Sequence, residues 1–149
     1  MAKTIRLEVI TPARMFYRGD VELVVVRTAS GEEGFMAGHV WARKLIDVGP
    51  LRIREAGGEM KYAVIDGGYL DVSDTIIMIY TDAAEWDSEI NLKLAEDQKE
   101  AAEKYLRENR NLPEDDLNIL AVRKGLARSN ARIRMARKRG VGAEERPKE

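Results

Sequence analysis

The sequence predicts an all-β N-terminal domain, an antiparallel β-sandwich or barrel, followed by an antiparallel α-helical hairpin, so that the protein is α+β overall. Apolar residues alternate with polar ones from Ile5 to about Tyr80, and this period of two is typical of half-buried strands. After Glu85 the apolar spacing becomes helical, with one short break. We therefore place the β-domain at residues 1–86, the helices at 87–140 and a flexible tail at 141–149.

The β-domain consists of short alternating runs separated by turn-forming residues. In the first run, Ile5, Leu7 and Val9 alternate with charged residues, and later runs are rich in valine and isoleucine. Strands about ten residues apart and divided by turns favour an antiparallel sandwich or barrel. From the glycine, proline, serine and aspartate residues, we expect turns at Thr11-Pro12, Arg18-Gly19-Asp20, Ser30-Gly31, Gly49-Pro50, Ala56-Gly57-Gly58-Glu59, Asp66-Gly67-Gly68 and Ser73-Asp74.

Two helices are predicted after the β-domain. Asp87-Ser88 is a favourable helix start, and no glycine or proline follows before about Arg110. Pro113 and the three acidic residues after it favour the start of the second helix. This helix should run to about Arg139 and end at Gly140-Val141-Gly142, because glycine commonly terminates helices.

The facing sides of the two helices are predicted to be lined by alanines. These are Ala95, Ala101 and Ala102 on the first helix and Ala121, Ala127 and Ala131 on the second. Alanines let the helix axes approach closely but bury little apolar area, at about 25 cal/mol per Å². The hairpin should therefore be the less stable part of the protein, and the part able to unfold or extend.

Composition excludes several classes of site. The chain has no cysteine, and its single histidine, His39, rules out a multi-histidine metal site. We expect no catalytic residues, no metal, no cofactor and no enzymatic activity of the chain itself. No uncharged run approaches the length of a membrane span, and the first residues lack the apolar stretch of a signal peptide. The protein is therefore expected to act in the cytoplasm.

The second helix carries a strong charge asymmetry. Between Leu117 and Gly140 there is no acidic residue, whereas eight residues are basic. They are Arg123, Lys124, Arg128, Arg132, Arg134, Arg137, Lys138 and Arg139. A solvated helix end could account for the last turn at most, and it does not account for the whole helix. So many like charges should be compensated by an acidic group on the first helix, on another protein or on nucleic acid. Because the helix has no aromatic residue for base stacking, an acidic protein surface is favoured, with a nucleic-acid-binding module as the alternative.

The order of the local motifs resembles that of one known family. Ser30-Gly31-Glu32-Glu33-Gly34 followed by Gly38-His39 resembles a Gly-Glu-x-Gly…Gly-His loop. Gly67-Gly68-Tyr69-Leu70-Asp71-Val72 resembles a Gly-Gly-x-x-x-Val hairpin, and Leu126 to Ile133 resembles an Ala-x-x-Arg-Ala-x-x-Arg-Leu helix. Over residues 3–136, the order and spacing of these motifs resemble the epsilon subunit of bacterial F-type ATP synthases.

This resemblance implies a non-catalytic rotor subunit of the central stalk. The β-domain would bind the gamma subunit and the polar loops of the c-ring, peripherally at the cytoplasmic face of the membrane. The hairpin would extend along gamma and inhibit ATP hydrolysis by meeting an acidic region of the beta subunit. Its regulatory residues would be Arg123, Lys124, Arg128, Arg132 and Arg134, and the c-ring and gamma interface candidates are Glu32, His39, Trp41 and Arg43.

The sequence departs from the family pattern in two places. Ala37 replaces a proline before Gly38-His39, and Val40-Trp41-Ala42-Arg43-Lys44-Leu45 adds an indole and two cations to the following loop. Some members bind ATP through an Ile-Asp-x-x-Arg-Ala motif, whereas this chain has Ile90-Asn91-Leu92-Lys93-Leu94-Ala95. Because leucine cannot donate to phosphate, ATP binding should be weak or absent. The possible residual nucleotide contacts are Glu85, Arg128 and Arg132.

Three features admit a plainer interpretation. His39 has no second histidine or adjacent nucleophile motif, so a loop or interface role is favoured over catalysis. Gly67-Gly68 lacks the strand-loop-helix context of a phosphate loop, which favours a hairpin turn. Glu32 is either a polar turn residue or a contact to the c-ring loops, and the sequence leaves both open.

Overall fold

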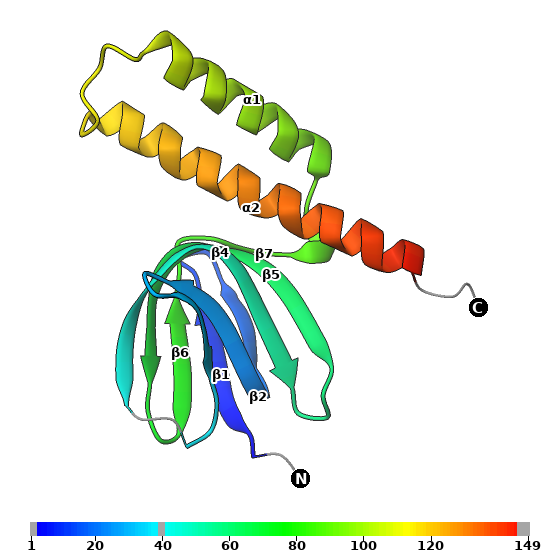
Figure 1. Ribbon diagram of the computed structural model, residues 1–149. Helices are drawn as coiled ribbons and strands as arrows, with labels where there is room; N and C mark the ends of the chain where they lie inside the picture. Colours follow the sequence, from blue (N-terminus) through cyan, green and yellow to red (C-terminus); the bar gives the residue numbers. More distant parts are fainter. Residues whose placement is uncertain (1–2, 39–40, 146–149) are drawn as a thin grey trace. The chain divides into compact units, whose positions relative to one another are not determined.

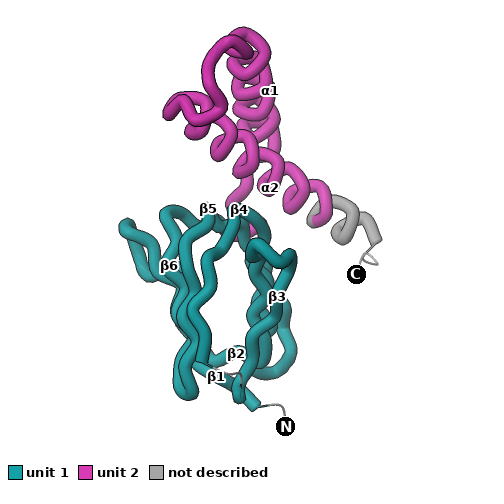
Figure 2. Tube along the Cα trace, turned by 60° about the vertical axis from the view of Figure 1, so that its left-hand side comes forward, with its two compact units in different colours: residues 1–85 teal, residues 86–149 magenta. Residues whose placement is uncertain are grey.

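The computed structural model describes residues 3–38 and 41–145, and side chains as far as residue 138. The chain divides into two compact units, Met1–Glu85 and Trp86–Glu149 (Figure 2). The first unit is a β-sheet and the second is a helical hairpin, so the predicted fold class is confirmed. His39 lies outside the described residues.

One sheet of seven strands forms the first unit (Figure 1). Their bounds are β1 Ile5–Ile10, β2 Met15–Thr28, β3 Gly31–Phe35, β4 Ala42–Glu55, β5 Met60–Val72, β6 Ile76–Tyr80 and β7 Ala84–Trp86. The order is β1-β6-β5-β4-β2-β3, with β7 paired to β5. Because β1 also pairs with β2, the sheet closes on itself as a small barrel.

Closure depends on one pair of parallel strands, which the sequence prediction did not include. β1 pairs with β2 antiparallel, from Ile5 opposite Val21 to Ile10 opposite Met15. On its other side β1 pairs with β6 in parallel, with Leu7 opposite Ile77. The sheet is therefore mixed, although every other pairing with a defined register is antiparallel. Among the described strands, closure leaves β3 and the short β7 paired on one side only. The other strands offer no free edge at which another strand could add.

Three of the predicted turns are bends inside long strands. Arg18-Gly19-Asp20 lies within β2, Gly49-Pro50 within β4 and Asp66-Gly67-Gly68 within β5. The prediction of a hairpin turn at Gly67-Gly68 is therefore wrong. Glycine marks tight bends at barrel corners as well as turns, and only the pairing of neighbouring strands distinguishes the two cases. The other four predicted turns do connect strands.

Gly68 has a specific steric reason to be glycine. Its φ is +121°, a conformation that other residues rarely adopt. A Cβ added at this position would overlap the backbone carbonyl oxygen of Tyr80. The neighbouring segment is fixed by the Asp66 N–H, which donates to Thr81 Oγ1 at 3.2 Å and to the Ala83 carbonyl at 3.0 Å. The bend therefore lets β5 turn tightly around the end of β6.

The barrel interior is filled by the apolar half of each alternating strand. The largest fully buried side chains are aliphatic apart from Phe35, and they come from strands β1 to β6. They are Phe35, Leu7, Leu51, Ile53, Ile65, Leu70, Ile77, Ile79, Val9, Val21, Val24 and Val26. Since successive residues of a strand point to opposite faces, the same alternation fixes which residues face outward.

A buried polar contact joins β2 to β4 near the β4–β5 hairpin. The Tyr17 hydroxyl donates to Glu55 Oε2 at 2.6 Å, and Lys61 Nζ lies 3.6 Å from the other carboxylate oxygen. Tyr17 is buried. Its burial and the adjacent Glu55 carboxylate raise the pKa of Tyr17 above its ordinary value of 10.0.

The second unit begins with a short 3-10 helix, η1 (Asp87–Glu89), followed by α1 (Leu92–Glu108) and α2 (Leu117–Glu145). Asp87-Ser88 therefore starts η1, and α1 begins later. Asn91 caps α1, because its side-chain oxygen accepts a hydrogen bond from the Leu94 N–H at 3.0 Å. Asp116 similarly accepts from the Asn118 and Ile119 N–H groups at the start of α2.

The second helix does not end at Gly140. It continues to Glu145, so the predicted hairpin boundary at residue 140 and tail at 141–149 are corrected by five residues. Each glycine inside a helix costs only about 1 kcal/mol relative to alanine. Extending a helix that has already formed still adds one backbone hydrogen bond per residue. Residues 146–149 lie outside the described residues.

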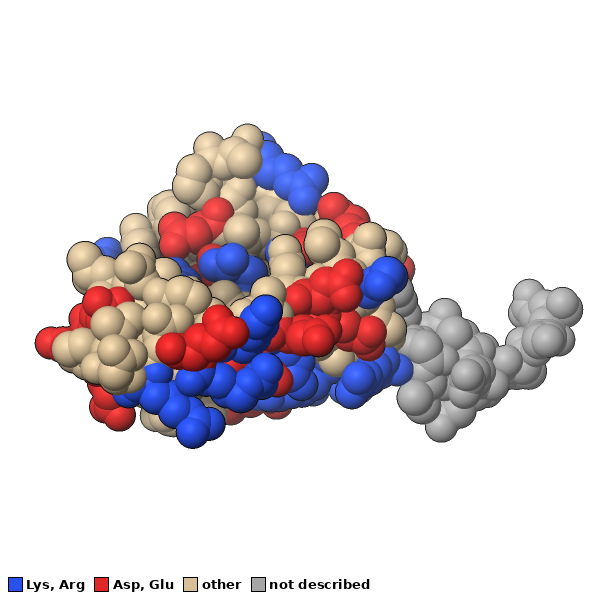
Figure 3. Space-filling model, turned by 90° about the horizontal axis from the view of Figure 1, so that it is seen from above, with Lys and Arg blue, Asp and Glu red and all other residues tan. Residues whose placement is uncertain are grey.

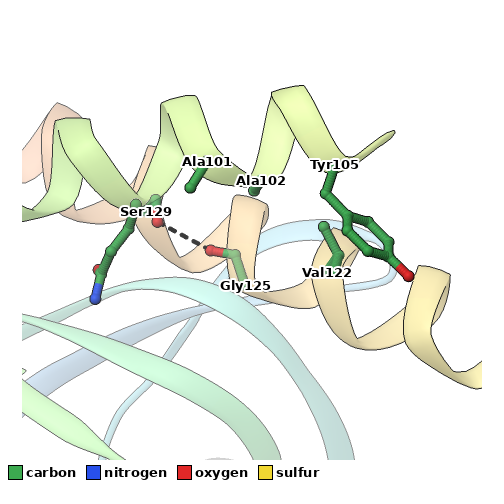
Figure 4. Close-up of a pocket in the computed structure, with 7 residues that line it drawn as sticks. Ala101, Ala102, Tyr105, Val122, Gly125 and Ser129 are labelled. Atoms are coloured by element: carbon green, nitrogen blue, oxygen red, sulfur yellow. Dashed lines mark hydrogen bonds between the residues drawn. The ribbon is translucent and has the colours of Figure 1, made fainter. Parts of the chain in front are cut away.

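The two helices pack antiparallel (Figure 1). Small residues form the seam between them, beside a shallow groove (Figure 4). Ala101 and Ala102 of α1 lie opposite Gly125 and Ser129 of α2, and the groove has a volume of about 330 Å³. The Ser129 hydroxyl donates to the Gly125 carbonyl at 3.0 Å. The predicted small-residue seam is therefore present, but Gly125 and Ser129 belong to it and the exposed Ala121 and Ala127 do not line its groove.

We predict that Gly68→Ala destabilises the β unit more than Gly57→Ala. Both glycines have positive φ, but a Cβ at Gly57 meets nothing within 4 Å, whereas one at Gly68 overlaps the Tyr80 carbonyl. The Gly57 variant should lose about 1–2 kcal/mol from the backbone conformation alone. The Gly68 variant should lose at least about 2 kcal/mol more. Urea unfolding of the two variants measures this difference, and equal losses would contradict the steric explanation.

We also predict that Tyr17→Phe lowers stability by about 1 kcal/mol at neutral pH, because Glu55 loses its donor. The folded-state pKa of Tyr17 is raised. The Tyr17 hydroxyl therefore contributes fully to the free energy of unfolding below pH 10. Above pH 10 this contribution is lost by about 1.4 kcal/mol per pH unit. The stability difference between the parent and the variant should shrink above pH 10.

Urea unfolding from pH 7 to 11 tests this prediction. Tyr62→Phe is the control, because the Tyr62 hydroxyl makes no hydrogen bond among the described residues. It should change stability by less than about 0.5 kcal/mol at neutral pH. A difference between parent and Tyr17→Phe that stays constant across this pH range would contradict the assignment.

Candidate functional site

Two surfaces of the molecule concentrate the side chains that could bind a partner, one in each unit. Within residues 3–38 and 41–145, no three histidine, aspartate or glutamate side chains are placed to hold a metal ion. None of the described helices is both long and apolar enough to cross a membrane.

The first surface lies on the outer face of β4, β5 and β6, and we call it the aromatic face. It consists of Trp41, Arg43, Leu45, Tyr69, Asp71, Met78 and Tyr80. The strand register creates it: Arg43 lies opposite Asp71, Leu45 opposite Tyr69, and Tyr69 opposite Tyr80. Each pair joins neighbouring strands of two successive hairpins, so the face forms once β4, β5 and β6 have paired.

A network of polar and aromatic contacts orders the centre of the aromatic face. Arg43 binds Asp71 through two hydrogen bonds, at 2.6 and 3.2 Å, and its guanidinium lies 5.8 Å from the Tyr69 ring centroid. The Tyr69 and Tyr80 rings stack with centroids 4.8 Å apart. The bidentate pair raises the pKa of Arg43 above its usual value, so this residue stays charged. Its charge is balanced locally by Asp71, which leaves the face nearly neutral.

Large apolar side chains extend from this network into solvent. Leu45 is 79% exposed and Trp41 is 70% exposed. A shallow groove beside Trp41 runs past Asp71 to Met78, and a second lies beside Tyr69 and Tyr80 toward Ile10. An exposed tryptophan and a tyrosine pair around an arginine have the composition of binding hot spots, in which Trp, Tyr and Arg are enriched. Leu45 adds exposed apolar area beside them.

The predicted interface residues occupy different positions on the barrel. Trp41 and Arg43 belong to the aromatic face. Glu32 lies on β3, not in a turn, and its carboxylate is 2.7 Å from Arg52 of β4. The adjacent Glu33 lies 3.7 Å from Lys44. The sequence analysis missed Leu45, Tyr69, Asp71 and Tyr80, although the alternation of Arg43 with Leu45 and of Tyr69 with Asp71 was a usable signal.

The second surface is the cationic side of α2. Arg123, Lys124 and Arg134 are exposed, whereas Arg128 and Arg132 are partly buried. At 100° per residue these five side chains span about half of the helix circumference. Two basic residues contact α1: Arg132 Nη1 donates to Gln98 Oε1 at 3.3 Å, and Arg137 Nη2 lies 3.7 Å from Glu96. In the surface view of Figure 3, acidic side chains lie beside basic ones.

The possible nucleotide contacts are not brought together within either unit. Glu85 belongs to β7 at the end of the first unit, and Arg128 and Arg132 lie on α2 in the second. Asn91, which replaces the aspartate of the nucleotide-binding motif, instead caps α1. Leu94, which replaces its arginine, is half exposed. These two residues therefore have a local structural role at the start of the helix.

Comparison with known proteins identifies relatives along most of the chain. A family model described as the ATP synthase delta/epsilon chain β-sandwich domain matches residues 4–87. The ATP synthase epsilon chain of Alkaliphilus metalliredigens is 38% identical over 128 residues, which are 86% of this chain and 95% of that one. The epsilon chain of Caldicellulosiruptor saccharolyticus is 40% identical over 136 residues, covering 91% and 96%.

A solved structure shares the fold. A chain in the cryo-EM structure of the Euglena gracilis mitochondrial ATP synthase superposes with a TM-score of 0.72 at 24% identity, covering 93% of this chain and 81% of that one. The aligned relatives span both the barrel and most of the hairpin. From the family match and these identities, we conclude that the chain belongs to the family of ATP synthase epsilon chains.

Proposed function

We propose that this chain is a non-catalytic subunit in the central stalk of a rotary ATP synthase. In this proposal the barrel binds the gamma subunit and the polar loops of the c-ring, and thereby couples rotation of the ring to the catalytic head. The hairpin restrains ATP hydrolysis when its basic residues meet an acidic region of the beta subunit. The chain then sits peripherally at the cytoplasmic face of the membrane, held there by the complex.

The aromatic face supports the coupling role. The exposed apolar surface surrounds the Arg43–Asp71 pair, which is held by two hydrogen bonds. A large protein partner could cover this surface with apolar groups of its own, whereas a flexible polar loop could not. We therefore assign the aromatic face to the gamma subunit. The closed sheet gives this surface a stiff support, since every strand from β1 to β6 except β3 is hydrogen-bonded on both sides. A stiff support can transmit torque without strand slippage.

The β3 carboxylates are better suited to the polar c-ring loops. Glu32 is accessible and already engaged with Arg52 at 2.7 Å. A solvent-exposed ion pair of this kind contributes little to stability, about 0–1 kcal/mol. Glu32 can therefore exchange Arg52 for a polar or cationic group on a partner at low cost.

The observation that carries the inhibitory role is the absence of any acidic residue between Leu117 and Gly140, together with the exposure of Arg123, Lys124 and Arg134. A helix with one sign of charge is attracted to a surface of the opposite sign. The small-residue seam and its groove indicate a hairpin with little buried apolar area. Such a hairpin can leave its packed posture at a small cost in free energy.

Removal of residues 88–149 should raise the ATP hydrolysis rate of the reconstituted complex severalfold, while ion-coupled ATP synthesis is kept. The physical reason is that the cationic helix is removed while every residue of the barrel strands remains. The measurement compares ATPase rates of complexes carrying the full or the shortened chain. An unchanged hydrolysis rate would refute the inhibitory role and leave the stalk role standing.

Leu45→Ser should weaken binding of the chain to its gamma subunit by about tenfold or more, because burying a leucine side chain in an interface contributes about 1.5–3 kcal/mol. Because Leu45 is 79% exposed, the change should leave the stability of the isolated chain within about 0.5 kcal/mol. Met60→Ser is the control, since Met60 is an exposed apolar side chain of the same unit outside the aromatic face. Equal effects of the two substitutions in a calorimetric titration would rule out this assignment.

A further inference from the structure

In two contacts across the hairpin, arginines of α2 bind oxygen acceptors of α1, as they would bind the carboxylates of the proposed partner. Arg132 Nη1 donates to the side-chain carbonyl of Gln98, at 3.3 Å, and Arg137 Nη2 lies 3.7 Å from the Glu96 carboxylate. A guanidinium presents its donors in a fixed planar fork that matches oxygen acceptors of this kind. An Arg side chain that is held by α1 cannot offer the same donors to a carboxylate on another protein.

These contacts lie at the solvent-exposed border of the hairpin. The side chain of Arg137 is 68% exposed and that of Glu96 is 47% exposed. Exposed ion pairs contribute about 0.2–1 kcal/mol and weaken as the salt concentration rises. The two contacts therefore contribute little to the free energy of the closed hairpin. The seam of small residues beside them is also weak, because Ala101 and Ala102 face Gly125 across a groove of about 330 Å³.

We propose that α1 contains an internal substitute for the acidic partner of α2. In the closed hairpin, Gln98 occupies Arg132, which belongs to the proposed regulatory residues, and Glu96 occupies Arg137, which we add to them. The closed posture and the inhibitory contact then compete for the same two guanidinium groups. This inference rests on the proposed inhibitory function and adds a regulatory element to it. The strength of the α1 contacts sets the fraction of time for which α2 is available to the partner.

The competition predicts how a weaker contact between α1 and α2 changes the inhibition of ATP hydrolysis. Weakening the α1 contacts should favour the open hairpin and therefore strengthen inhibition. A loss of 0.2–1 kcal/mol corresponds to about a 1.5- to 5-fold change in the equilibrium between the closed and open postures. The effect should be largest at low ionic strength and should fade as salt screens the pair.

The variant Glu96→Gln tests the proposal, and Glu100→Gln is its matched control. Both residues lie on exposed positions of α1, and each substitution removes one negative charge with little change in helix propensity. Glu96 and Glu100 are four residues apart, so either substitution relieves the same repulsion between them. Within the described part of the chain Glu100 makes no ion pair.

Two measurements are made on each variant at low and high salt. The first is amide hydrogen exchange of residues 132–137 in the isolated full-length chain. Exchange reports opening of the hairpin because α2 frays more readily once α1 no longer packs against it. The second is the ATP hydrolysis rate of the reconstituted complex. We expect Glu96→Gln to speed exchange and to lower hydrolysis, each by about 1.5- to 5-fold at low salt, with no such change for Glu100→Gln.

The possible failures separate the two proposals. If Glu96→Gln behaves like Glu100→Gln in both measurements, or speeds exchange without lowering hydrolysis, the competition is refuted. If removal of residues 88–149 leaves hydrolysis unchanged, the inhibitory function itself is refuted, whatever the Glu96 variant does. A charge swap adds a further check: Glu96→Arg with Arg137→Glu should restore slow exchange but leave hydrolysis faster than in the parent complex, since the partner then meets a like charge.

Discussion

The pairing of β1 with two strands at once is the constraint on which the rest of the barrel depends. All six of its residues form antiparallel pairs with β2 on one side, and five of them, from Arg6 to Ile10, form parallel pairs with β6 on the other. Without this strand the order β6-β5-β4-β2-β3 would be an open sheet. Closure places Leu7 and Val9 in the interior and fixes the outward direction of every alternate side chain. The position of the aromatic face follows from that geometry.

The two units differ in how they are held together, and this difference matches their proposed roles. The barrel is stabilised by a continuous ladder of backbone hydrogen bonds around an aliphatic core, which resists deformation. The hairpin is stabilised by a seam of small residues and by exposed polar contacts at its border. A rigid unit suits a permanent contact that carries load. A weakly packed unit suits a contact that forms and dissolves with conditions.

The departures from the family pattern gain a structural explanation. The loop that replaces the usual prolines begins β4 and contributes Trp41, Arg43 and Leu45 to the aromatic face. Arg43 is matched by Asp71 on the opposite strand, so the added cation has a partner within the chain. Asn91 and Leu94 are similarly used at the start of α1, where the amide caps the helix. Substitutions that looked like losses of a motif are therefore integrated into the local structure.

The sequence by itself determined which residues are buried, where the β unit gives way to helices, and the charge of the second helix, because alternation, helical spacing and composition are local properties of the chain. The tertiary structure decided which glycines bend a strand and which end it: Gly68 and Gly57 share a positive φ, but only Gly68 lies against the carbonyl of Tyr80. It also decided that β1 and β6 run parallel and that Arg43, Asp71, Tyr69 and Tyr80 become neighbours. The β1–β6 pair joins strands that are distant in the sequence and forms only when the whole sheet closes. The neighbours on β4, β5 and β6 depend on the register of two successive hairpins, and a shift of one residue would turn these side chains to the other face.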